Sequence, residues 1–224
     1  MALHFRPMPN LKRIRERPRW LVIFLVLASV NILVELLMQP YLVQSLLHHL
    51  PPSVTEQDKL VVAQSLERGS FARLAFLPIR LLIGWWSFAL LLYYISSSLL
   101  SRQPLRFAHI FSLEVRAEAI LLLAKGATLF RLMIDSSSLS SRSTVPLSCA
   151  EFFPVNDYSI FTFLNSLNFF TIAYLAILTI GISVLYAVSK AKALFFVCIA
   201  WGISILFNVS VVAVLRDQMF LLLN

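Results

Sequence analysis

Charged residues, glycine and cysteine are scarce in this sequence, and each shortage excludes a class of protein or site. Only 13% of the 224 residues are charged, whereas 59% are hydrophobic and 18 are phenylalanine. A soluble domain of this length needs much more polar surface, so we expect a membrane protein. The two cysteines, Cys149 and Cys198, lack the spacing of a metal site or a redox pair. We predict no metal site and no cofactor.

The sequence patterns of known membrane enzymes are also absent. There is no His-Glu-x-x-His motif, which would place two zinc ligands and a base on one helix face. Neither Gly181-Ile182-Ser183 nor Gly202-Ile203-Ser204 is followed by the last glycine of a nucleophile elbow. The Glu and His set of CAAX-type membrane proteases and a phosphate-cradling glycine-rich loop are missing too. We therefore predict that the protein is not an enzyme.

Long apolar runs dominate what is present. At a rise of about 1.5 Å per residue, roughly 20 apolar residues cover the ~30 Å hydrocarbon core of a bilayer. Five runs meet this requirement, at about residues 20–38, 79–100, 113–134, 169–188 and 193–215. They predict an all-α membrane protein with one domain, a bundle of five transmembrane helices.

Basic residues indicate how this bundle is oriented. They are concentrated in the tail formed by residues 1–19, in the connection around Arg102, and in the turn with Lys190 and Lys192. Short segments rich in Lys and Arg remain in the cytoplasm, so we predict an inside N-terminus and an outside C-terminus, with residues 216–224 as a short external tail. The net charge of +8 then reflects orientation in the lipid bilayer, and no nucleic-acid partner is expected.

Turn and cap signals predict where the first helices end. Pro40 should end the first span, and Pro78 suits the first turn of the second. Between them, a short amphipathic external helix is expected from about 54 to 68, with Gly69 just past its end. The aromatic stretch 158–163 should lie at the membrane interface as an amphipathic or re-entrant lead into the last two spans.

Four polar residues inside predicted spans form a candidate intramembrane site. Asn31 and Glu35 are four apart on one face of the first span, and Glu118 and Lys125 are seven apart on nearly one face of the third. Lys125 should face the bundle interior, a wet crevice or another subunit, because burying its charge alone costs several kcal/mol. A structural contact and a functional site both remain open. Glu35, and charged residues near the ends of the third span such as Glu114, are expected to reach headgroup water.

The last two predicted spans carry no ionisable residue, but they do contain small ones. Small side chains let a second helix approach closely in lipid. The candidate helix-packing contacts are Gly181, Ser183, Gly202 and Ser204.

The last two predicted spans form a hairpin with a recognisable pattern. It consists of an entry with Asn and aromatic residues, an aliphatic-x-aliphatic-Gly centre and a short basic turn. The stretches are Leu164-Asn165-Ser166-Leu167-Asn168-Phe169-Phe170, Leu178-Thr179-Ile180-Gly181 and Ser189-Lys190-Ala191-Lys192-Ala193-Leu194. The pattern resembles the Yip (Ypt-interacting protein) domain family of five-span membrane proteins. The long soluble N-terminal region and Asp-Leu-Tyr-Gly-Pro signature of its eukaryotic branch are absent, so the chain looks more like the compact bacterial branch. This resemblance implies a bacterial inner-membrane protein that accompanies a transport system.

Two functions fit these features. The favoured one is a non-enzymatic accessory or scaffold subunit that docks a membrane partner complex, or self-associates, through the small residues of the last hairpin. The alternative is a small lipid or ion transporter that works as an oligomer through the polar groups of the first and third spans.

Overall fold

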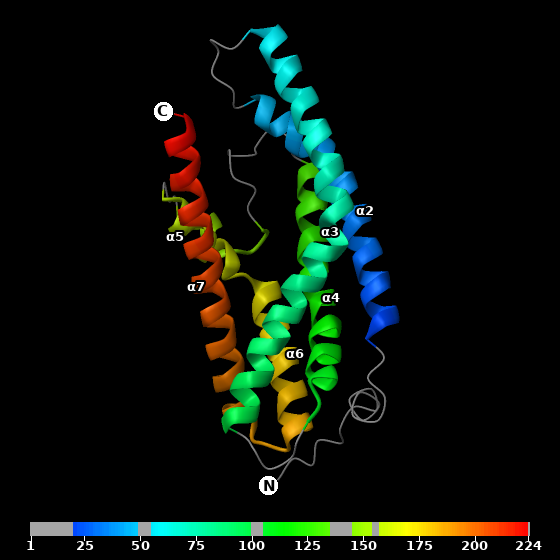
Figure 1. Ribbon diagram of the computed structural model, residues 1–224, viewed down its shortest axis with the longest axis vertical. Coiled ribbons are helices and arrows are strands. Elements are labelled where there is room, and N and C mark those ends of the chain that lie inside the picture. Colours follow the sequence, from blue (N-terminus) through cyan, green and yellow to red (C-terminus); the bar gives the residue numbers. More distant parts are fainter. Residues whose placement is uncertain (1–19, 49–54, 100–104, 135–144, 154–156, 224) are drawn as a thin grey trace.

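The computed structural model describes residues 20–48, 55–99, 105–134, 145–153 and 157–223, and in these ranges the chain is helical (Figure 1). No strand occurs in the described ranges, although Ser148 and Asn168 form a single antiparallel bridge. The predicted basic tail, residues 1–19, lies outside the described residues. The elements are α2 (Leu21–His48), α3 (Glu56–Leu99), α4 (Phe107–Ile134), the 3-10 turn η1 (Cys149–Glu151), α5 (Tyr158–Ser166), α6 (Phe169–Tyr186) and α7 (Lys190–Leu223).

Four helices are long and apolar enough to cross a membrane, which fits the predicted membrane protein. The segments that meet this criterion are Leu21–Gln44, Leu74–Ser98, Phe169–Tyr186 and Lys190–Ser210. At 28 residues α4 is also long enough, but its charged side chains keep it out of this set. The all-helical class is confirmed, and the fifth span remains a prediction.

Two predicted helix ends are wrong. α2 continues through Pro40 to His48, and α3 is one helix of 44 residues that contains both Gly69 and Pro78. A proline removes one backbone hydrogen bond, yet an apolar environment offers the neighbouring backbone groups no partners outside the helix. Gly69 does not have the left-handed conformation that ends a helix, since no described glycine has a positive φ. The expected external helix at 54–68 is therefore the beginning of α3.

The other boundaries differ less from the prediction. α4 begins at Phe107 rather than near residue 113, and α6 ends at Tyr186. α7 extends to Leu223, so nearly all of the predicted external tail, residues 216–224, continues the last helix.

α4 lies at the centre of the molecule and packs against α2, α3 and α6, while α7 packs against α3, α5 and α6. The apolar core residues of α4, such as Ile110, Leu113 and Val115, are at most 1% exposed. In Figure 1 the start of α4, the end of α3 and the turn between α6 and α7 lie near the bottom, and the C-terminus lies near the top. The turn with Lys190 and Lys192, which is predicted to be cytoplasmic, thus lies toward the same end of the bundle as the end of α3 and the start of α4.

Side-chain caps explain why α5 and α6 are separate helices. Asp157 begins α5 by accepting hydrogen bonds from the backbone N–H groups of Ser159 and Ile160. Asn168 begins α6 in the same way, with its side chain accepting from Thr171 N at 2.9 Å. The asparagine-rich entry noted in the sequence therefore contains a helix cap.

Candidate functional site

The structure brings together three of the four predicted polar residues between α2 and α4. Lys125 Nζ donates to Asn31 Oδ1 at 2.9 Å and to Glu35 Oε1 at 3.2 Å. Asn31 is buried, whereas the side chains of Lys125 and Glu35 are 34% and 19% exposed. The charge of Lys125 is thus neutralised by the Glu35 carboxylate, and its ammonium group is also hydrogen-bonded to the Asn31 amide.

The geometry of α2 holds both partners of Lys125 in place. Asn31 and Glu35 are one turn apart, so their side chains project from the same face. Asn31 Nδ2 also donates to the backbone carbonyl of Leu27 at 3.1 Å. Because this contact occupies the amide nitrogen, the amide oxygen points toward the ammonium group.

Glu35 lies deeper than the sequence indicated. The apolar segment of α2 extends to Gln44, so Asn31 and Glu35 lie on either side of its midpoint. The expectation that Glu35 reaches headgroup water is replaced by a direct ion pair with Lys125. Burial of the pair in an apolar environment makes loss of either partner costly.

Glu118 belongs to the same region but is not a direct partner of Lys125. It interacts with Lys125 through electrostatics and lies next to the indole of Trp85 from α3. The direct partners of Lys125 come from α2 rather than from its own helix. The seven-residue spacing predicted that Glu118 and Lys125 lie on one face of α4. It could not predict that α2 packs against Lys125 on this face.

Sequence reasoning missed a second buried acid, Glu114. Tyr174 Oη of α6 donates to Glu114 Oε1 at 2.6 Å, and the two residues are only 4% and 1% exposed. The expectation that Glu114 reaches headgroup water is therefore wrong. A signal was available, because Glu114 precedes Glu118 by four residues and Lys125 by eleven, which is close to three helical turns.

Glu114, Glu118 and Lys125 consequently form a row along one face of α4. The row interacts in turn with Tyr174 of α6, with Trp85 of α3 and with α2. A helix with this many charged residues can lie inside a bundle only if neighbouring helices supply polar contacts.

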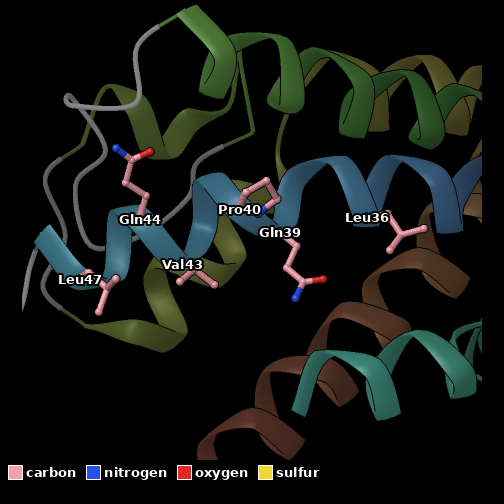
Figure 2. A pocket seen from close by; sticks show the side chains of 6 residues that line it. All are labelled: Leu36, Gln39, Pro40, Val43, Gln44 and Leu47. Atoms are coloured by element: carbon pink, nitrogen blue, oxygen red, sulfur yellow. The ribbon is translucent and has the colours of Figure 1, made fainter. Parts of the chain in front are cut away.

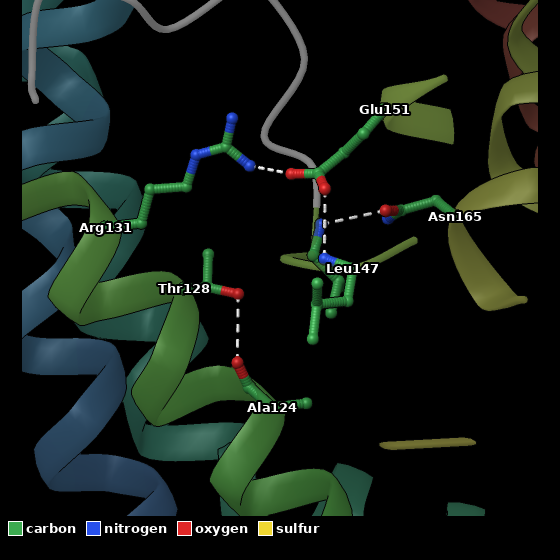
Figure 3. A network of polar contacts seen from close by, with 7 residues as sticks. Ala124, Thr128, Arg131, Leu147, Glu151 and Asn165 are labelled. Carbon is green, nitrogen blue, oxygen red and sulfur yellow. Dashed lines mark hydrogen bonds and ion pairs between the residues drawn. The ribbon is translucent and has the colours of Figure 1, made fainter. Parts of the chain in front are cut away.

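A separate polar network holds the loop of residues 145–153, which contains η1, against the end of α4 (Figure 3). Arg131 pairs with Glu151 Oε1, and Glu151 Oε2 accepts from the backbone N–H of Leu147 at 3.0 Å. Asn165 Oδ1 accepts from Val145 N at 2.8 Å, which connects the loop to α5. These contacts are structural, and none reaches the row on α4.

The four predicted packing residues have different surroundings. Gly181 is buried against α4, and a Cβ placed there would come within 2.4 Å of Leu113 Cδ1. Ser183 donates to Val188 O at 2.7 Å and stabilises the end of α6. Gly202 has no atom within 4 Å of a hypothetical Cβ, and Ser204 is partly exposed on the same helix. Of the two glycines, only Gly202 is therefore open to close approach by another chain.

A surface hollow occurs on the C-terminal half of α2 (Figure 2). It is lined by Leu36, Gln39, Pro40, Val43, Gln44 and Leu47. Its lining contains two amides and no charged side chain, and none of the residues in the polar row on α4 contributes to it. The hollow offers no chemistry for catalysis.

Within the described part of the chain, no group of three or more His, Cys, Asp or Glu residues could hold a metal ion. Cys149 and Cys198 are both free thiols. Comparisons with protein-family models, curated proteins and solved structures gave no significant match.

Proposed function

We propose that this chain is a non-enzymatic accessory or scaffold subunit that docks a membrane partner complex. The observation that carries the proposal is the incomplete cover of the Lys125–Glu35 pair, which lies at the middle of an apolar segment and leaves about a third of the lysine side chain exposed. A lysine at the centre of a membrane helix costs about 3 kcal/mol on insertion scales. A partner that covers this part of α2 and α4 would lower that cost.

The open surface of α7 supports the same proposal. Gly202 lies on a partly exposed part of the helix, next to the 45% exposed Ile203 and near the 67% exposed Leu206. A partner helix can approach closely at a glycine, where packing and interhelical contacts drive association in lipid. Gly181 is not available for this role, because α4 of the same chain already occupies its surface.

The proposal includes the finer topology expected from the sequence. α4 serves as the fifth span, with its charged row turned toward neighbouring helices, and the bundle has an inside N-terminus and an outside C-terminus. A bacterial inner membrane and an association with a transport system are proposed from the resemblance to the compact Yip-domain proteins. The turn with Lys190 and Lys192 lies toward the same end of the bundle as the end of α3 and the start of α4, which supports this orientation.

Co-purification of the full-length protein in a mild detergent tests the docking surface. Gly202→Leu should reduce the amount of bound partner or second copy at least about tenfold, because a bulky side chain prevents close helix approach. Gly84→Leu is the matched control, since Gly84 of α3 also has no atom within 4 Å of its hypothetical Cβ. Equal recovery with both variants would contradict docking at Gly202.

A small ion transporter is the second candidate, and the row on α4 favours it. Glu114, Glu118 and Lys125 extend over about three turns of one helix, and such rows of acids and bases line ion paths in membranes. Flux measured with the reconstituted protein should then fall in Lys125→Met and Glu118→Gln. Unchanged flux in both variants would exclude this function.

A further inference from the structure

Glu114 is the most enclosed acidic group in the described part of the chain. Its side chain is 1% exposed, and Oε1 accepts the Tyr174 hydrogen bond at 2.6 Å. Oε2 is buried as well and has no hydrogen-bond partner. Neither the docking surface on α7 nor the Lys125 contacts with α2 use this group.

The helices packed around Glu114 supply it with no positive charge. The titratable groups that act on it are Tyr174 of α6 and Glu118 of α4, and a second carboxylate can only disfavour a negative charge. The charged residue in the described part of α2 is Glu35, which faces Lys125.

Trp85 of α3, which carries no charge, lies next to the row on α4, whereas the side chain of Arg80 of α3 is exposed. An isolated carboxylate in such a place is far less favourable than the neutral acid. A proton bound to Oε2 removes the charge and leaves the Tyr174 hydrogen bond intact.

Glu118 provides a path by which this proton can exchange. It lies one turn along α4, where Cβ atoms are about 5–6 Å apart. Glu118 is also partly exposed and interacts electrostatically with Lys125, which itself contacts Glu35. A sequence of ionisable groups thus leads from the buried Glu114 to the partly exposed ion pair.

We propose that Glu114 and Tyr174 form a buried proton-binding site, and that Glu118 transfers the proton between this site and the Lys125–Glu35 pair. In the first transfer, the O–H bond at Glu114 Oε2 breaks as an O–H bond forms on the Glu118 carboxylate. In the second, that O–H bond breaks as the proton passes to the Glu35 carboxylate, because the Lys125 ammonium group is already protonated. The resulting Glu114 carboxylate keeps the Tyr174 hydrogen bond, and no electrons are exchanged. This site is independent of the proposed docking function, because neither residue lies on the open surface of α7.

Infrared spectroscopy of the full-length protein in lipid tests the bound proton. At neutral pH the spectrum should contain the C=O stretch of a protonated carboxyl group, and Glu114→Gln should remove that band. Glu151→Gln is the control. Glu151 of η1 is paired with Arg131 of α4, so it should be ionised and should not contribute to this band. A band that persists in Glu114→Gln, or no band at all in the unaltered protein, would overturn the proposal.

Tyr174→Phe provides a second readout that does not require replacing the acid. Loss of the hydrogen bond to Oε1 should shift the Glu114 band to higher frequency, and an unshifted band would contradict the assignment. For the transfer step, Glu118→Gln should slow deuterium exchange of the Glu114 proton by at least about tenfold. Exchange at the original rate would show that Glu118 does not transfer the proton. The proton-binding site at Glu114 is tested separately, by the loss of the infrared band in Glu114→Gln.

Discussion

Lys125 connects the two helices that contribute most of the polar chemistry of this protein. Its ammonium group binds Asn31 and Glu35, and Asn31 in turn uses its amide nitrogen to hold the backbone of α2. At the scale of single residues, spacing along a helix predicted which side chains share a face. Spacing alone could not predict that Glu35 faces Lys125, because these residues are 90 positions apart and their contact depends on how α2 and α4 pack.

Removing one member of the Lys125–Glu35 pair should destabilise the protein more than removing both. Lys125→Met leaves the Glu35 carboxylate without a counter-charge, and Glu35→Gln leaves the Lys125 ammonium group without one, whereas the double variant removes both charges. We expect a coupling energy of about 1–2 kcal/mol, measured by reversible unfolding of the single and double variants in detergent. Lys59→Met, a change in the first turn of α3 outside the pair, is the control. Additive effects of the two substitutions would show that the pair contributes nothing.

At the scale of whole elements, apolar runs predicted the existence of the helices better than their ends. Pro40 and Gly69 were expected to end helices, yet both lie inside them. Pro40 lies within the apolar segment Leu21–Gln44, where backbone groups freed at a helix end would have no water to bind. Gly69 lies before the apolar segment of α3 and keeps a helical conformation without a positive φ. The cap at Asn168 follows the ordinary rules, because it lies between α5 and α6, just before the apolar segment Phe169–Tyr186.

Two glycine substitutions should have opposite effects on stability. Gly181→Ala places a Cβ against Leu113, which is 1% exposed and has little room to move, so the strain should exceed the gain in helix propensity. We expect a net loss of about 1 kcal/mol. Gly202→Ala meets no atom within 4 Å and should be neutral or stabilise by up to about 1 kcal/mol. Thermal unfolding of both variants checks this, and an equal response would contradict the described packing of α6 on α4.

The turn after α6 offers a substitution that should stabilise the protein. Ala187 has a left-handed conformation with φ 53° and ψ 42°, and its N–H caps the helix at Ser183 O. A residue with a Cβ is disfavoured there by roughly 1 kcal/mol relative to glycine. Ala187→Gly should therefore raise the free energy of unfolding by about that amount. Ala191→Gly, just inside α7, should instead lower it, and a loss of stability in both variants would show that the turn is not left-handed.

At the scale of the whole molecule, composition predicted an all-helical membrane protein, but the charged α4 is the element that composition describes least well. Its charges predicted that Lys125 faces the bundle interior, a wet crevice or another subunit, and that Glu114 reaches headgroup water. The structure places α4 at the centre with Glu114 buried. Which face of α4 each helix covers depends on tertiary packing. The sequence could therefore not predict that Tyr174 would be the partner of Glu114.

The orientation of the bundle can be measured with single cysteines in a variant whose Cys149 and Cys198 are replaced by serine. Ala191 is exposed at the start of α7, beside the basic turn, and Leu147 is exposed in the loop of residues 145–153. Each is replaced by cysteine in turn. A membrane-impermeant thiol reagent added to intact cells should label position 147 directly and position 191 only after permeabilisation. The reverse pattern would invert the proposed topology.

The most direct test of the proposed scaffold role is the mass of the particle that the protein forms in its native membrane. The full-length chain can be extracted with a polymer that retains surrounding lipid, and its protein mass can be determined by light scattering combined with gel filtration. We expect a particle clearly heavier than one chain of 25.4 kDa, with a stoichiometric companion or a second copy that covers the Lys125–Glu35 pair. A homogeneous particle that contains a single chain and lipid would contradict the scaffold role.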